Sequence, residues 1–103
     1  MEMTTDTAAG YFAGLLTGRG SFGLNDVGEP WLYFTALDHE VVDEALEMWG
    51  GRVSQKLNAH GVSRYKYTAP TERVREILED LLPHLRGQKR EHADELLEYL
   101  SSP

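Results

Sequence analysis

The sequence predicts an α+β protein in which helices cover one face of a single four-stranded, mainly antiparallel sheet. Two observations predict this class. Segments with the apolar spacing of a helix alternate with short segments rich in aromatic and β-branched residues, in the order αββαββα. The 103-residue chain also has no linker, repeat or low-complexity segment, so we expect residues 1–103 to form one domain.

The amino-terminal part of the chain predicts a helix followed by a hairpin. Residues 4–7 are of the polar kinds that cap helices, the apolar run Ala8–Leu16 follows, and Gly18 and Gly20 end it. Alternation of apolar and polar residues then predicts two strands and the turn that joins them: Ser21–Asn25, Trp31–Leu37 and residues 28–30.

The remainder predicts a helix, a second hairpin and a helical end. Apolar residues at 3.6-residue spacing place a helix at His39–Trp49, which Gly50 and Gly51 end. Strands at Arg52–Leu57 and Val62–Thr68 follow, joined by a loop at 58–61. Pro70 lies near the start of a helix with a buried leucine-rich stripe, Gly87 breaks that helix, and Gln88–Leu100 forms the last one.

Charge is distributed unevenly along the chain. The formal net charge is −7, yet residues 50–69 hold four bases and no acid, while residues 1–49 carry a net −8. An acidic protein is poorly suited to bind phosphates over its whole surface, because such contacts need Lys and Arg. A basic segment inside it predicts one dedicated anion-binding face, and the alternative is chance clustering of solvated side chains.

Alternation also assigns the strand side chains to two faces of the sheet. We expect helices to cover the apolar face: Phe22, Leu24, Leu32, Phe34, Ala36, Val53, Leu57, Tyr65 and Tyr67. The opposite side, called the open face below, collects polar, aromatic and basic residues: Ser21, Asn25, Trp31, Tyr33, Thr35, Arg52, Ser54, Lys56, Arg64 and Lys66. Cations for phosphates and polar groups for base edges are what a sheet needs to bind DNA; an ordinary solvated face is the alternative.

Two stretches of the chain resemble one known family. Residues 11–22 read YFAGLLTGRGSF, which is similar to the LAGLIDADG motif of homing endonucleases and the Ser-Phe that follows it. Residues 81–86, with Lys89, Ala93 and residues 96–97, resemble the last segment of that family, and the strand and helix order between the two stretches agrees. The resemblance covers nearly the whole chain and implies a saddle-shaped sheet that binds duplex DNA.

The resemblance also implies a homodimer, because members with one motif pair through the motif helix. In this chain Gly14 and Gly18 lie four residues apart on one stripe of that helix. Small residues on a stripe let two helix backbones approach closely. We therefore expect a dimer interface at Ala13, Gly14, Thr17 and Gly18; the alternative is that the glycines fit against this chain's own sheet.

The metal-binding acid that the family implies is replaced in this chain. The family has an acid just before the last motif glycine, where it binds a divalent metal for phosphodiester hydrolysis, and the matching residue is Arg19. A guanidinium cannot ligate Mg²⁺. Lys89 matches the family's basic residue near the scissile phosphates. We expect cleavage to be lost and Arg19 and Lys89 to contact DNA; for Arg19, neutral decay or pairing with an acid such as Asp26 are the alternatives.

The sequence predicts no other cofactor and no membrane partner. It contains no cysteine, and its four histidines lack the spacing of a metal site on one helix face. No run of about 18 apolar residues and no charged-then-apolar leader occurs, so we expect a cytoplasmic protein.

Three functional classes remain. The favoured one is a catalytically inactive, homing-endonuclease-like homodimer that binds duplex DNA through the basic open face. The second is an active endonuclease with an atypical metal site, which would use Mg²⁺. The third is a protein-interaction module that kept the fold, a class that the net charge of −7 favours. RNA is an alternative nucleic-acid partner for the first class.

Overall fold

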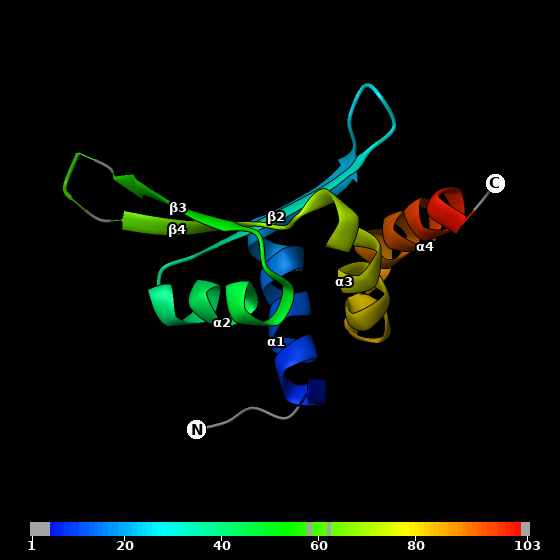
Figure 1. The fold of residues 1–103 in the computed structure, drawn as a ribbon. Coiled ribbons are helices and arrows are strands. Elements are labelled where there is room, and N and C mark those ends of the chain that lie inside the picture. Colours follow the sequence, from blue (N-terminus) through cyan, green and yellow to red (C-terminus); the bar gives the residue numbers. More distant parts are fainter. Residues whose placement is uncertain (1–4, 58, 62, 102–103) are drawn as a thin grey trace.

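A computed structural model, which describes residues 5–57, 59–61 and 63–101, has one antiparallel sheet with a layer of helices beneath it (Figure 1). The strands lie in the order β1-β2-β4-β3 and are β1 (Gly20–Leu24), β2 (Pro30–Ala36), β3 (Arg52–Leu57) and β4 (Ser63–Thr68). The helices are α1 (Thr5–Arg19), α2 (His39–Trp49), α3 (Val74–Leu81) and α4 (Gly87–Ser101), with short 3₁₀ turns at Thr71–Arg73 and Leu82–His84. The predicted α+β class is confirmed.

The strand registers confirm the predicted division of the sheet into two faces. Residues that lie opposite each other in neighbouring strands point to the same face. The longest row on the open face runs across all the strands and consists of Ser21, Tyr33, Thr68 and Arg52. Shorter rows lie beside it: Thr35-Lys66-Ser54, Gly23-Trp31 and Arg64-Lys56.

The core lies between the other face of the sheet and the helices. Phe34 is fully buried at its centre, with its ring centroid 5.6 Å from that of Phe12 in α1 and 5.1 Å from that of Tyr67 in β4. The Tyr67 hydroxyl donates a 2.7 Å hydrogen bond to the carbonyl oxygen of Gly50, and burial raises the pKa of Tyr67 to about 12. These contacts fasten β2 and β4 to the helical layer.

Helix α1 is longer at both ends than the sequence predicts. It begins at Thr5, so the predicted capping residues 5–7 lie inside it, and residue 4 lies outside the described part of the chain. The prediction that Gly18 ends the helix is wrong, because α1 continues to Arg19 and β1 begins at the next residue. Packing of the buried side chains of Phe12 and Leu16 against the sheet outweighs the low helix propensity of the glycines.

The first hairpin is shifted by one residue from its prediction. Strand β1 ends at Leu24 and β2 begins at Pro30, so Asn25 is a turn residue and its assignment to the open face is wrong. The Asn25 side-chain oxygen accepts hydrogen bonds from the backbone N–H groups of Val27 and Glu29, at 3.1 and 2.9 Å. Asn favours such local bonds, which hold the turn closed.

The second hairpin extends past the helices that should cover it (Figure 1). Leu57, which we expected on the covered face, is 71% exposed, and Val53 at the other end of β3 is half-buried. Of the predicted loop at 58–61 and the strand start at 62, Asn58 and Val62 lie outside the described residues.

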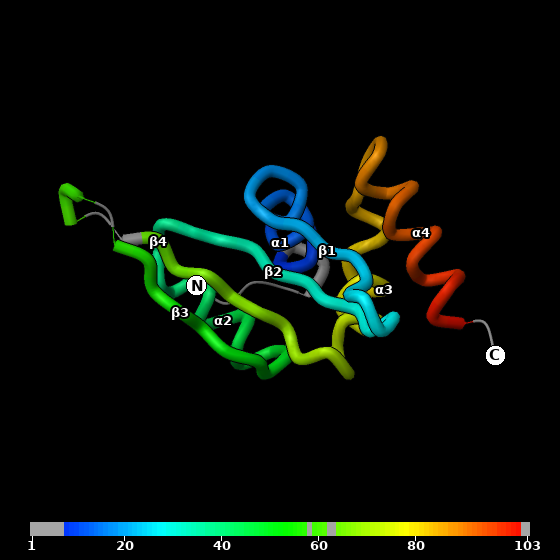
Figure 2. Tube along the Cα trace, turned by 90° about the horizontal axis from the view of Figure 1, so that it is seen from above, coloured from blue at the N-terminus to red at the C-terminus, as the bar shows by residue number. Residues whose placement is uncertain are grey.

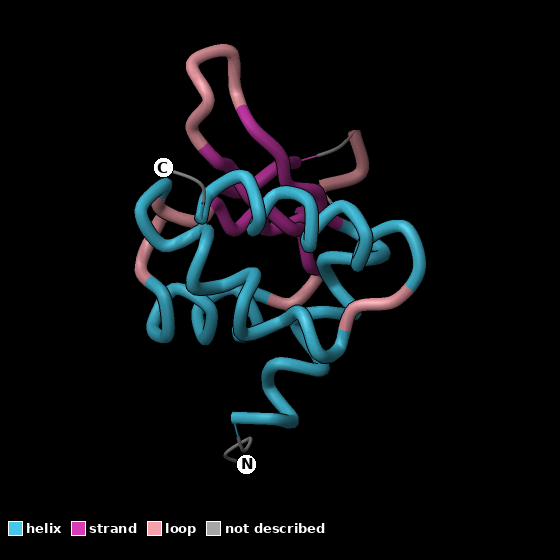
Figure 3. The backbone as a smooth tube through the Cα atoms, turned by 90° about the vertical axis from the view of Figure 1, so that its right-hand side faces the viewer, coloured by secondary structure: helices cyan, strands magenta, loops and turns pink. Residues whose placement is uncertain are grey.

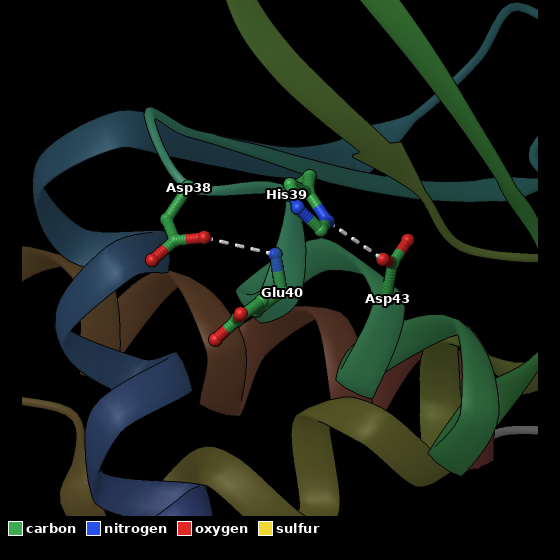
Figure 4. Close-up of polar contacts among 4 residues, drawn as sticks. All are labelled: Asp38, His39, Glu40 and Asp43. Carbon is green, nitrogen blue, oxygen red and sulfur yellow. Dashed lines mark hydrogen bonds and ion pairs between the residues drawn. The ribbon is translucent and has the colours of Figure 1, made fainter.

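Helix α2 has the bounds that the sequence predicts, because local signals fix both of its ends. Asp38 caps it by accepting a 3.0 Å hydrogen bond from the backbone N–H of Glu40, and His39 shares a 3.0 Å hydrogen bond with Asp43 one turn later (Figure 4). Gly50, at a φ of 71°, ends the helix. Within the ranges described above, no helix has the length and apolarity that a membrane span requires.

Candidate nucleic-acid interface

The open face forms a trough. Both hairpins rise above the middle of the sheet, and the helices lie on the other side (Figure 1). From above, the strands run side by side and no helix lies over their middle (Figure 2). A side view shows the turn between β1 and β2 standing above the strand layer (Figure 3). This face is therefore the accessible surface of the sheet.

The basic side chains of the open face have no acidic partners among the described residues. In the part of the chain that the structure describes, no ion pair involves any of the four: Arg52, Lys56, Arg64 and Lys66. The arginines near α3 differ, since Arg73 and Arg75 pair with Glu76 and Glu79 at 2.9 and 3.0 Å. The cations of the open face thus remain available to an external anion.

Two aromatic side chains and a lysine form an ordered row on the open face. The rings of Trp31 and Tyr33 are stacked, with centroids 6.0 Å apart and planes 15° apart. The Lys66 ammonium lies 4.5 Å from the centroid of the Tyr33 ring, in a cation–π arrangement. Trp31 keeps 37% of its surface exposed, so the row ends in an accessible indole.

The motif residues meet where α1 passes into β1. The Thr35 hydroxyl donates a 3.3 Å hydrogen bond to the carbonyl oxygen of Arg19, and the Lys89 ammonium donates one of 3.1 Å to that of Gly20. Lys89 also lies 5.5 Å from the centroid of the Phe22 ring. The fold therefore gathers Arg19 and Lys89, which are far apart in sequence, at one end of the edge strand.

Arg19 itself is exposed and forms no ion pair with any residue that the structure describes. Asp26, the acid suggested as its partner, follows the opposite end of β1, so that alternative is wrong. Asp38 lines the same shallow depression as Arg19, but its carboxylate caps α2.

The residues at this junction do not fit a divalent metal ion. Such an ion needs several oxygen ligands, preferably carboxylates. No group of three His, Asp or Glu side chains that could hold a metal occurs within residues 5–57, 59–61 and 63–101. Arg19 and Lys89 at the junction are cations that would repel the ion, and the nearby carboxylate of Asp38 already caps α2.

The predicted dimer residues divide between the two sides of α1. Gly14 and Gly18 are exposed, and a Cβ atom at either would meet nothing within 4 Å, so they do not fit against the chain's own sheet. Thr17 is exposed and its hydroxyl donates a 2.8 Å hydrogen bond to the Ala13 carbonyl. Ala13 is only 1% exposed and packs in the protein's own core, which corrects its assignment to the interface.

The structure also shows one residue of the open face, and one contact beneath the sheet, that the sequence analysis missed. Thr68 lies between Tyr33 and Arg52 on the open face, and alternation from Lys66 is the signal that identifies it. His92 of α4 packs its ring edge against Phe22, with centroids 4.7 Å apart. That contact joins α4 to β1, and no pattern in the sequence predicts it.

No model of a protein family and no curated protein matches this sequence. Solved structures of the homing endonuclease I-CvuI match its fold. A complex with the I-CreI target, in which Mg is present and the DNA is not cleaved, aligns with a TM-score of 0.58 at 17% identity. A complex with the enzyme's own target and Ca aligns with a TM-score of 0.55 at 15% identity. The fold is homing-endonuclease-like.

The match does not extend over the whole neighbour. Each alignment covers 91% of this chain and 66% of the I-CvuI chain, so this chain spans just under two thirds of that protein's length. At these identities the likeness describes the fold and leaves the function to be argued from the residues.

Proposed function

We propose that the protein binds duplex DNA on the open face as a homodimer and does not cleave it. The observation that carries this proposal is the set of unpaired cations on a concave sheet: Arg52, Lys56, Arg64 and Lys66. The fold is one that I-CvuI uses in complexes with its DNA target, which supports duplex DNA as the partner.

The charge pattern supports one mode of approach. Unpaired cations displace the counterions of DNA phosphates, and that release is a large part of binding free energy. The rest of the molecule repels the same phosphates, because residues 1–49 and 70–103 carry net charges of −8 and −3. Attraction on one face and repulsion elsewhere orient the duplex along the trough.

Dimerisation through α1 follows from the need for a longer trough. One sheet presents four cations, whereas two copies related by a twofold axis double that number along one duplex. Gly14 and Gly18 have no side chain on the exposed side of α1, which permits close approach of a second helix there. The neighbouring Tyr11 and Leu37 are 45% and 58% exposed and supply apolar surface to bury in the contact.

In this proposal, Arg19 binds a DNA phosphate at the position where the family has its metal-binding acid. A guanidinium can hold a phosphate through two parallel hydrogen bonds, and no acid among the described residues pairs with Arg19 and competes for it. In the dimer, two Arg19 side chains would repel each other unless a phosphate lies between them. Bound DNA therefore stabilises the pair.

The first test is selection of bound duplexes from a random pool, followed by affinity measurements at several salt concentrations. We expect a pseudo-palindromic preferred site, one dimer per duplex by analytical ultracentrifugation, and affinity that falls steeply with salt. Absence of binding at low salt would refute the proposal, and nicking of the selected duplex with Mg²⁺ or Mn²⁺ would refute its inactive part.

The second test concerns Arg19. Arg19→Ala is expected to reduce the slope of log affinity against log salt by about two per dimer, since each subunit loses one phosphate contact. Arg75→Ala is the matched control, because Arg75 lies on α3 and pairs with Glu79. Equal slopes for the wild-type protein and Arg19→Ala would exclude the phosphate-binding role. Nicking by Arg19→Asp with Mg²⁺ would show that the remainder of the active site has survived.

A further inference from the structure

A depression of about 410 Å³ lies where β4 leaves the sheet, and the sequence analysis did not anticipate it. Its volume is within the range of small-molecule sites, about 300–1,000 Å³. Its lining includes residues with an aromatic ring, a guanidinium and two hydroxyls (Trp31, Arg52, Thr68 and Thr71), and Gly51, Ala69 and Pro70 complete it. It opens on the same side of the sheet as the unpaired cations, because Arg52 and Thr68 belong to the longest row of the open face.

Close packing of the backbone fixes one side of this depression. After Thr68, the chain leaves β4 with one more sheet-like hydrogen bond, 3.0 Å from the Ala69 N–H to the Leu32 carbonyl, and then turns at Pro70. Gly51 has a φ of 106°, and a Cβ there would collide with the carbonyl oxygen of Thr68. Only glycine fits this position, and its backbone forms part of the lining beside Arg52.

The aromatic wall is held rigidly in place. One side of the Trp31 ring stacks on Tyr33, which Lys66 covers in turn. Across the strand, Gly23 lies directly under the indole, where a Cβ would come within 3.0 Å of its Cζ2 atom. Because the ring is already ordered, stacking a further ring on it costs little side-chain entropy.

The depression combines the groups that bind a nucleotide. Arg52 forms no ion pair with any described residue, and none of the lining residues is an acid. A base can stack on Trp31, a phosphate can bind Arg52, and the hydroxyls of Thr68 and Thr71 can donate to base or phosphate oxygens. A base inside an intact duplex cannot do this, because both of its faces are covered by neighbouring pairs.

We propose that this depression binds one unpaired nucleotide of the nucleic acid, with its base stacked on Trp31 and its phosphate on Arg52. The inference rests on the proposed function, since the duplex on the open face delivers the nucleotide to the end of β4. The protein then prefers duplexes that carry an unpaired nucleotide over fully paired ones.

The test uses two labelled duplexes that differ only by a single bulged nucleotide, with binding followed by fluorescence anisotropy. Base stacking on an aromatic side chain contributes about 1–3 kcal/mol, so the wild-type protein should bind the bulged duplex roughly 5- to 150-fold more tightly. Trp31→Ala should weaken both complexes and bring this ratio to about one, whereas Trp31→Phe should keep part of it. Lys56→Gln is the matched control from the same face, and it should weaken both complexes by the same factor.

A second readout separates this inference from the proposed function. The chain has two tryptophans, and Trp49 is buried with 4% of its surface exposed, so a base stacked on Trp31 should quench part of the emission. A short single-stranded oligonucleotide should therefore quench the wild-type protein but not Trp31→Phe. If it does so while no duplex binds, the nucleotide site stands and the proposed function fails.

Three outcomes overturn the nucleotide site. If the wild-type protein binds both duplexes with equal affinity, there is no nucleotide site, although the proposed function still holds. A ratio that survives in Trp31→Ala, in a variant whose melting temperature and circular dichroism match the wild type, removes Trp31 from the site. Stronger quenching by an acidic peptide than by the oligonucleotide at equal concentration assigns the depression to a protein partner.

Discussion

The two hairpins of the sheet differ in what lies beneath them and in what they present above. Under β1 and β2, the side chains of Phe22, Leu32 and Phe34 are buried against helices. Strands β3 and β4 extend past the helical layer, so that Leu57 is 71% exposed, and they carry all four cations of the open face: Arg52, Lys56, Arg64 and Lys66.

This difference shows how one small sheet can separate stability from binding. Buried aromatic residues in the first hairpin hold the domain together, since each contributes through the apolar area that it removes from water. The second hairpin contributes less to the core, and its solvent exposure lets it carry unpaired charge without a desolvation penalty. We expect substitutions to affect stability in one hairpin and DNA affinity in the other.

The largest effect should follow from emptying the core beneath the first hairpin. Phe34→Ala is expected to lower the free energy of unfolding by about 3–5 kcal/mol, because it leaves a cavity between Phe12 and Tyr67. The measurement is urea denaturation followed by circular dichroism. Leu57→Ala in the second hairpin is the control, with an expected change within about 0.5 kcal/mol. A comparable loss in both variants would contradict the division between the hairpins.

A smaller effect should follow from neutralising the tip of the second hairpin. The double variant Lys56→Gln, Arg64→Gln should bind duplex DNA roughly tenfold more weakly at about 0.1 M salt, with a salt slope lower by about two per subunit. Both side chains are exposed, so the urea midpoint should stay at its wild-type value. A lower midpoint with an unchanged salt slope would mean that these residues serve the fold and not the interface.

The smallest effect concerns the start of α2, beneath the second hairpin. The hydrogen bond that the His39 ring donates to the Asp43 carboxylate, together with the charges of nearby acids, raises the pKa of His39 from its ordinary value of 6.5 (Figure 4). A raised pKa in the folded state means that this contact stabilises the protein below about pH 6.5 and is lost as the pH rises through the pKa of His39. An NMR titration should show Asp43→Asn shifting that pKa downward. No downward shift would exclude Asp43 as the cause.

Local signals made parts of the fold predictable. The bounds of α2 and β3 follow from the sequence because Asp38 caps the helix and Gly50 ends it, and because alternation continues through Arg52–Leu57. The bounds of helix α1 differ from the predicted ones at both ends, since glycine commonly ends a helix and packing against the sheet keeps Gly14 and Gly18 inside this one.

The same contrast applies to the candidate site. Alternation with a period of two placed the cations and the aromatic pair on one face, whereas the turn role of Asn25 followed from strand bounds that lie one residue earlier than predicted. The unoccupied space beside Trp31 was not predictable, because it forms between a strand start, a strand end and a turn that are distant in sequence.

The sequence by itself determined the class of fold, the face of nearly every strand residue and the basic character of that face. These properties depend on short-range periodicity and composition. Only the tertiary structure decided that Ala13 points inward while Gly14 and Gly18 point outward, that Leu57 lies beyond the helical layer, and that Trp31 and Arg52 flank one depression. Those outcomes depend on strand register and on how far each helix reaches under the sheet, which are contacts between distant parts of the chain.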